Sequence, residues 1–221
     1  MSEQPTHRQF SDEPVRTFLD ALSSSAPTPG GGAAAALVGA MAAALVSMVC
    51  NLTIGRPRYH AVESTLRAVL TQSERSRQRL ATLADDDASA YAAVASAYRL
   101  PRSDESERAA RTAAIQQALI QAAAPPLAVL TECRSLLPLC LQVAAHGNAA
   151  VVSDAGVAAE LATAGVRSSI LNVRVNLAEI KDQGFVARGE GDIAAVESGL
   201  QEELDRVVGI VRAKLAPKGT P

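Results

Sequence analysis

Charged side chains are missing from one long stretch of the chain. Residues 21–55 contain no Asp, Glu, Lys or Arg, and residues 33–53 are mostly alanine with some Leu, Val and Met. These residue types favour an α-helix. Because small side chains let neighbouring backbones approach closely, the pattern predicts a helix buried on all sides at the centre of a helical bundle.

An uncharged helix of this length could also cross a membrane. The stretch has few of the Leu, Ile and Phe residues that favour insertion, and it has no lysine-rich flank. No second stretch in the sequence looks comparable. We therefore expect a protein without a membrane segment.

The remaining pattern predicts further helices separated by Pro and Gly. These cover residues 15–24, 58–100, 105–123, 126–146, 154–183 and 192–215, with a break near 82–86 left open, a turn at 147–148 and a loop at 184–191. Strand patterns are nearly absent, so the expected fold class is all-α, a bundle of long helices around the Ala/Gly-rich helix. We expect residues 1–14 to be a mobile tail and residues 15–221 to form a single helical domain.

Composition narrows the function classes. Hydrophobic residues make up 48% of the chain but aromatic residues only 3%, which suits close-packed helices. The net charge of −2 gives no sign of a nucleic-acid surface. Three cysteines without a CxxC pair are typical of reduced, buried thiols in a cytoplasmic protein. The three histidines are too scattered to predict a metal site.

The segment after Asp154 shows the most informative helical pattern. At about 100° per residue, one side carries the charged residues Arg167, Arg174 and Lys181, and polar residues lie opposite, between two apolar flanks. This polar strip comprises Asp154, Gly165, Ser168, Ser169, Asn172 and Asn176. Buried polar groups need hydrogen-bond partners. The strip therefore indicates inter-helix hydrogen bonds or a dimer seam, or else a pocket for a polar ligand such as a pterin ring.

One carboxylate of the acidic run 85–87 differs from its neighbours. On a helix, Asp87 shares a face with apolar residues and with Tyr91, whereas Asp85 and Asp86 point elsewhere and are expected to be solvated. A carboxyl group on an apolar face has a raised pKa, as a general acid needs near neutral pH. The alternative is a buried carboxylate bonded to a helix end or to an arginine.

Two segments could bind anions. Arg56, Arg58 and Tyr59 follow the uncharged helix directly, and arginines can bind carboxylates in a bidentate manner. They could equally be a charged helix junction. The backbone N–H groups of Gly30, Gly31 and Gly32 offer a second anion or oxyanion site at a helix start.

Nine segments, taken in order, resemble the formiminotransferase-cyclodeaminase C-terminal family. They are residues 27–32 (PTPGGG), 48–53 (MVCNLT), 55–59 (GRPRY), 87–91 (DASAY), 100–101 (LP), 124–127 (APPL), 147–148 (GN), 153–157 (SDAGV) and 172–176 (NVRVN). The resemblance covers residues 15–179. Ala33 departs from it, since the family usually has Ser after the glycines, and residues 56–58 carry arginines where the family is more often lysine-rich.

The resemblance implies a folate one-carbon enzyme without a metal or redox cofactor, whose substrate is a tetrahydrofolate derivative. A cyclodeaminase closes 5-formimino-tetrahydrofolate to 5,10-methenyl-tetrahydrofolate and releases ammonia, and a cyclohydrolase adds water to the methenyl compound. We take the cyclodeaminase as the first expectation and the cyclohydrolase as the alternative. A non-catalytic helical dimer that binds a small metabolite is the rival hypothesis.

Roles follow for the candidate residues. Asp87 is the expected proton shuttle and Asp154 the second catalytic carboxylate. Asn148, Asn172 and Asn176 would hold the pterin or the reacting nitrogens, and Tyr91, Arg56, Arg58, Tyr59 and the three glycines would complete the substrate site. Since the long helices need partners for their apolar sides, we expect a homodimer with the pocket near the interface.

Overall fold

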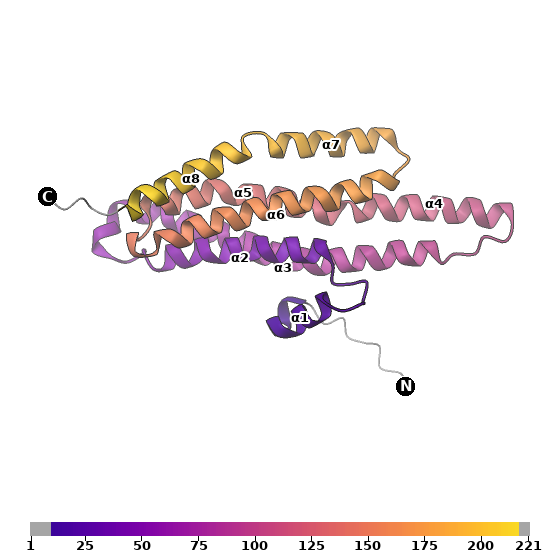
Figure 1. The fold of residues 1–221 in the computed structure, drawn as a ribbon, viewed down its shortest axis with the longest axis horizontal. Coiled ribbons are helices and arrows are strands. Elements are labelled where there is room, and N and C mark those ends of the chain that lie inside the picture. Colours follow the sequence, from indigo (N-terminus) through magenta and orange to yellow (C-terminus); the bar gives the residue numbers. More distant parts are fainter. Residues whose placement is uncertain (1–9, 217–221) are drawn as a thin grey trace.

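The computed structural model describes residues 10–216, and these contain helices but no strand. The helices are α1 (Val15–Leu22), α2 (Gly31–Asn51), α3 (Glu63–Tyr98), α4 (Glu105–Ala122), α5 (Ala124–His146), α6 (Val152–Glu179), α7 (Gln183–Glu197) and α8 (Leu200–Leu215). The long helices run side by side, with α7 and α8 along one edge and α1 on the opposite side (Figure 1). The predicted all-α bundle is confirmed.

Helix α2 packs against α3, α5 and α6, and glycines permit the close approach. A Cβ atom on Gly39 of α2 would collide with the sulfur of Cys133 on α5, and so would a Cβ on Gly165 of α6. The small-residue packing is therefore confirmed. The prediction of burial on all sides is wrong for the single chain, because Met41 is 52% exposed.

The C-terminal third differs from the prediction. The expected loop at 184–191 is wrong, because α7 covers it. The chain leaves the helix earlier, at residues 180–182, and again before α8 at Gly199, which has a φ of +69°. Gly189 lies inside α7, where a Cβ would come within 2.9 Å of Leu177 Cδ1. This glycine serves close packing of α7 on α6, which a sequence pattern cannot distinguish from a loop. Helix α3 is unbroken at residues 82–86.

Residues 10–14 belong to the folded part of the chain, so the predicted boundary of the mobile tail is wrong there. The backbone N–H of Phe10 donates to Asp85 Oδ1 at 2.7 Å, and the Phe10 ring packs edge-on against Phe18. Asp85 is therefore not the fully solvated carboxylate that the sequence predicts. The rest of the predicted tail, residues 1–9, lies outside the described residues.

By length and hydropathy alone, three stretches of the described chain could cross a membrane: Gly31–Asn51, Glu105–His146 and Ala149–Glu179. The expectation of a single such stretch is therefore wrong. Between 50% and 61% of the most apolar part of each is buried inside the protein. This burial is typical of helices that pack on one another in a bundle.

Candidate active site

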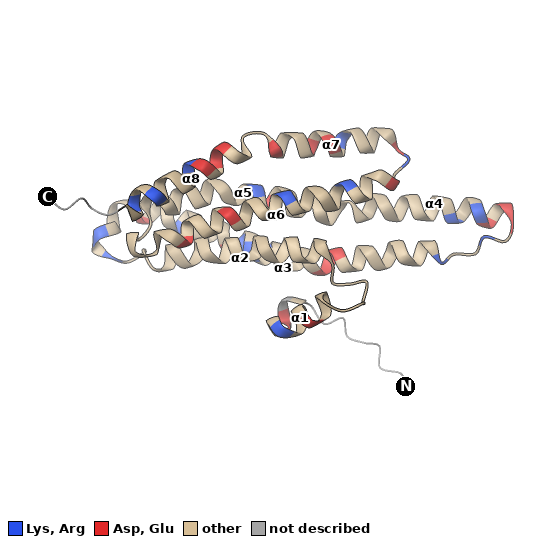
Figure 2. Ribbon diagram, in the orientation of Figure 1, with Lys and Arg blue, Asp and Glu red and all other residues tan. Residues whose placement is uncertain are grey.

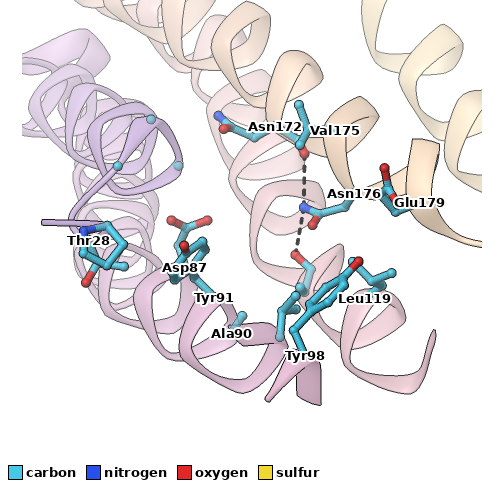
Figure 3. Close-up of a pocket in the computed structure, with 16 residues that line it drawn as sticks. Thr28, Asp87, Ala90, Tyr91, Tyr98, Leu119, Asn172, Val175, Asn176 and Glu179 are labelled. Carbon is cyan, nitrogen blue, oxygen red and sulfur yellow. Dashed lines mark hydrogen bonds between the residues drawn. The ribbon is translucent and has the colours of Figure 1, made fainter. Parts of the chain in front are cut away.

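A cavity of about 340 Å³ opens where the start of α2 meets α3, α4 and the end of α6 (Figure 3). Its volume lies within the usual range for small-molecule sites. Among the described residues, those that line it are Pro27, Thr28, Gly30, Gly31, Gly32, Asp87, Ala90, Tyr91, Val94, Tyr98, Leu119, Ala122, Asn172, Val175, Asn176 and Glu179. Six of the predicted site residues are therefore brought together with Asp87.

Asp87 of α3 caps the first turn of α2. The backbone N–H of Ala33 hydrogen-bonds to its carboxyl group, and a Cβ on Gly32 would overlap that carboxyl group. Burial raises the pKa of Asp87, and the hydrogen bond from Ala33 lowers this pKa by a smaller amount. The predicted anion site at this helix start is thus occupied in part by the chain's own carboxylate, which is poised to exchange protons.

Asn172 and Asn176 of α6 present acceptors to the cavity. The amide nitrogen of Asn172 donates to Ser168 O at 3.0 Å, and that of Asn176 donates to Ala122 O and to Asn172 O at 3.2 and 3.1 Å. Since backbone carbonyls can only accept, these bonds identify the nitrogen of each amide; Asn176 uses both of its N–H donors and Asn172 uses one. Within the described chain no group donates to either Oδ1 atom, so both oxygens remain available to a ligand.

Aromatic rings and a second carboxylate complete the rim. Tyr91 and Tyr98 of α3 are 48% and 45% exposed, and Glu179 lies at the end of α6 beside Asn176 (Figure 3). Sequence reasoning placed Tyr98 on the helix face of Asp87 but gave no site role to Tyr98 or to Glu179. Their spacing could have revealed them, because Tyr98 follows Tyr91 by seven residues and Glu179 follows Asn172 by seven, which puts each pair on one helix face.

The remaining predicted binding residues lie at the other end of α2. Tyr59 O–H approaches Asn148 Oδ1 at 3.4 Å, Asn148 Nδ2 donates to Leu52 O, and the Asn148 N–H donates to Thr53 Oγ1. Asn148 is thus a structural link between two chain reversals. Arg56 and Arg58 are exposed and belong to no ion pair within the described chain.

Asp154 also lies away from the cavity within the single chain. It precedes Asn172 on α6 by 18 residues, which corresponds to about 27 Å along a helix. Its place in the first turn of α6 suits a carboxylate, because the helix dipole is positive there.

The three cysteines and the arrangement of possible metal ligands do not point to thiol or metal catalysis in the described part of the chain. Burial raises the pKa of Cys50 to about 11 and that of Cys133 and Cys140 to about 12, so these thiols stay protonated and inert. In residues 10–216, no three His, Cys, Asp or Glu side chains gather as a set of metal ligands.

Comparison with known proteins assigns the family. The formiminotransferase-cyclodeaminase family matches residues 14–195. The chain belongs to this family. It is 48% identical, over 92% of its own length and 98% of the relative's, to a methenyltetrahydrofolate cyclohydrolase of Methylorubrum extorquens.

Two further relatives from the family carry the other activity in their names. A formimidoyltransferase-cyclodeaminase of Rattus norvegicus is 34% identical over 92% of the chain, which spans only 38% of that larger protein. The crystal structure of a formiminotetrahydrofolate cyclodeaminase from Thermotoga maritima matches with a TM-score of 0.82 and 32% identity, over 91% of this chain and 97% of that one.

Proposed function

We propose that this protein is a methenyl-tetrahydrofolate cyclohydrolase, a cytoplasmic enzyme of folate one-carbon metabolism. The observation that carries the proposal is the 48% identity to a cyclohydrolase of nearly the same length. The order of the two sequence-based expectations is therefore reversed. The cavity beside Asp87 supports an enzyme rather than a purely structural dimer.

The reaction needs one base and one acid. Water attacks the methenyl carbon between N5 and N10, and the Asp87 carboxylate takes one proton from it, leaving a tetrahedral carbinol. The bond from that carbon to N5 then breaks. N5 takes the proton held on Asp87, the carbinol O–H loses its proton to solvent, and 10-formyl-tetrahydrofolate results. A carboxyl group with a raised pKa suits both transfers, and no redox step occurs.

The acceptors in the cavity match the pterin edge. A reduced pterin offers an amino group and ring N–H groups as donors, and Asn172 and Asn176 each present an uncommitted oxygen. The Tyr91 and Tyr98 side chains offer flat apolar surface for the ring system. Asp87 on α3 then faces the ring from the side opposite α6 (Figure 3).

The second candidate is a formimino-tetrahydrofolate cyclodeaminase, favoured by the fold match to the Thermotoga maritima protein. In that reaction N10 attacks the formimino carbon and ammonia leaves. Asp87 would accept the N10 proton and donate one to the departing nitrogen. Both reactions pass through a tetrahedral carbon between N5 and N10, so one cavity could serve either.

Absorbance of the methenyl compound decides between them. Purified protein is incubated with 5,10-methenyl-tetrahydrofolate, and its absorbance falls faster than in buffer if the first proposal holds. With 5-formimino-tetrahydrofolate, the same absorbance rises if the second holds. An unchanged rate with both substrates would reject both and leave the metabolite-binding dimer as the remaining hypothesis.

A further inference from the structure

Glu179 brings a second carboxylate to the cavity. It is the last residue of α6, and acidic residues are seen both at the end of α6 and in the middle of α3, the helix of Asp87 (Figure 2). No Lys or Arg is among the described residues that line the cavity. Within the described chain the Glu179 carboxylate belongs to no ion pair and accepts no hydrogen bond. It is therefore available to a ligand.

Helix α4 holds the backbone that carries Glu179 in place. Gln116 Nε2 donates to Glu179 O at 2.9 Å, and the Lys181 N–H donates to Gln116 Oε1 at 2.7 Å. One amide side chain thus binds the main chain on both sides of the point where α6 ends. A carboxylate on a fixed backbone loses less freedom when it binds a ligand.

Glu179 lies two helical turns away from the level of Asp87. A Cβ on Gly32 would overlap the Asp87 carboxyl group, and a Cβ on the preceding residue would lie 3.4 Å from Asn172 Oδ1, so these two side chains are level. Glu179 follows Asn172 by seven residues, which is about 10.5 Å along the same face of a helix. Figure 3 shows Asp87 and Glu179 on opposite sides of the cavity.

This spacing suits a pterin whose one-carbon unit lies at Asp87. The 2-amino nitrogen at the far end of the ring system is roughly 6 Å from that unit, as ring bonds of about 1.4 Å require. With a contact of about 3 Å at each end, the acceptor for the amino group is expected about 12 Å from Asp87. Glu179 lies close to that distance along α6.

The ring system also matches the free acceptors of the cavity in number. In the methenyl compound its N–H donors are the amino group, N3–H and N8–H. A carboxylate accepts N3–H and one amino N–H side by side, as it does from a guanidinium group. The free oxygens of Asn172 and Asn176 remain for the second amino N–H and for N8–H.

We propose that Glu179 recognises the 2-amino and N3–H groups of the pterin, at the end of the cavity away from Asp87. Glu179 is then a binding residue, remote from the bonds that change. This inference rests on the proposed folate substrate and names a residue for its recognition.

Binding of tetrahydrofolate, which carries no one-carbon unit to react, tests the proposal by calorimetry. Glu179→Gln should bind it about 10- to 100-fold more weakly than wild type, the loss expected for a hydrogen bond to a charged group. The matched control is Glu197→Gln, because Glu197 is also the exposed last residue of a helix but does not line the cavity. Its affinity should equal that of wild type. Both variants should fold, since each removes a negative charge from a helix C-terminus. Equal affinities of all three proteins, or no binding by wild type, would overturn the proposal.

A tetrahydrofolate analogue with a methyl group in place of the 2-amino group identifies the part of the ligand that Glu179 contacts. With this analogue the wild type should lose most of its advantage over Glu179→Gln, because a group that the carboxylate binds is missing. A purely structural role of Glu179 would weaken the binding of both ligands by the same factor, and that result rejects the contact.

Kinetics separate this inference from the proposed function. With the methenyl substrate, Glu179→Gln should raise KM and keep kcat close to that of wild type, as loss of uniform binding does. A fall in kcat with an unchanged KM would contradict a binding role. Wild-type protein that binds tetrahydrofolate but converts neither folate rejects the proposed function, and the calorimetric comparison still decides the role of Glu179.

Discussion

Gly32 leaves the space that the carboxylate of Asp87 occupies. The two residues lie 55 positions apart in the sequence, yet a single Cβ atom on Gly32 would overlap the carboxyl group. The position of the proposed proton shuttle is therefore set jointly by α2 and α3.

Gly32→Ala should displace the Asp87 carboxyl group and lower kcat by about 100-fold, since small misplacements of a catalytic group have effects of this order. Steady-state kinetics with the methenyl substrate measures it. The matched control is Gly191→Ala in α7, where a Cβ would meet nothing within 4 Å. This control should keep kcat and gain about 0.5–1 kcal/mol of stability. Equal kcat values for both variants would contradict the role of the contact.

Asp87→Asn should raise thermal stability at neutral pH while it lowers activity. Burial raises the pKa of Asp87 in the folded state, so the ionised form costs folding free energy above that raised pKa. The gain from Asn is full there, shrinks as pH falls through the raised pKa, and vanishes below the ordinary value of 3.8. Thermal unfolding of both proteins across this pH range tests the sign. A Tm difference between the two proteins that does not change with pH would show that the charge on Asp87 does not destabilise the folded protein.

Asn176→Ala and Asn172→Ala should separate binding from stability. Asn176 donates a hydrogen bond to Ala122 at the end of α4 and so links α6 to α4, whereas the hydrogen bond that Asn172 donates, to Ser168, stays within α6. Both variants should raise KM, but only Asn176→Ala should cost about 1 kcal/mol in denaturant unfolding, the usual net value of one hydrogen bond. Equal unfolding free energies for the two variants would contradict this.

Arg134→Met should destabilise the protein by about 1.5–3 kcal/mol, the value of hydrogen bonds to charged groups. Arg134 Nη2 and Nη1 pair with both carboxylate oxygens of Glu203 at 2.6 and 2.5 Å, and the two side chains are mostly buried. Arg174→Met is the control, because its pair with Glu190 is long and half-exposed. Urea unfolding should move for the first variant only, and kcat for neither.

The Arg134–Glu203 ion pair should stabilise the protein only above a certain acidic pH. Hydrogen bonding to Arg134 lowers the pKa of Glu203 below its ordinary 4.5. The stabilisation is therefore present above 4.5 and is lost as pH falls through the lowered pKa. The stability difference between wild type and Arg134→Met should shrink in that acid range, and a constant difference would speak against the ion pair.

The fold could be predicted well from the sequence because long uncharged or amphipathic runs specify helices locally. Helix positions of Asp87, Asn172 and Asn176 followed from periodicity alone. The prediction of a loop around Gly189 was wrong. A glycine that makes room for the Leu177 side chain inside a helix cannot be distinguished in the sequence from a glycine that ends a helix. Helical periodicity shows on which face of a helix a residue lies, but not at which end of the bundle. Asp154 and Tyr59 therefore could not be placed along the bundle from the sequence.

The sulfur atom of Cys133 sits where Gly39 and Gly165 leave no spare volume. An alkylating reagent adds atoms to sulfur, so it can react there only in molecules whose four-helix centre has come apart. The rate of labelling at Cys133 therefore follows the fraction of opened molecules when closing is faster than alkylation, and mass spectrometry of the labelled peptide would compare that fraction among the variants above.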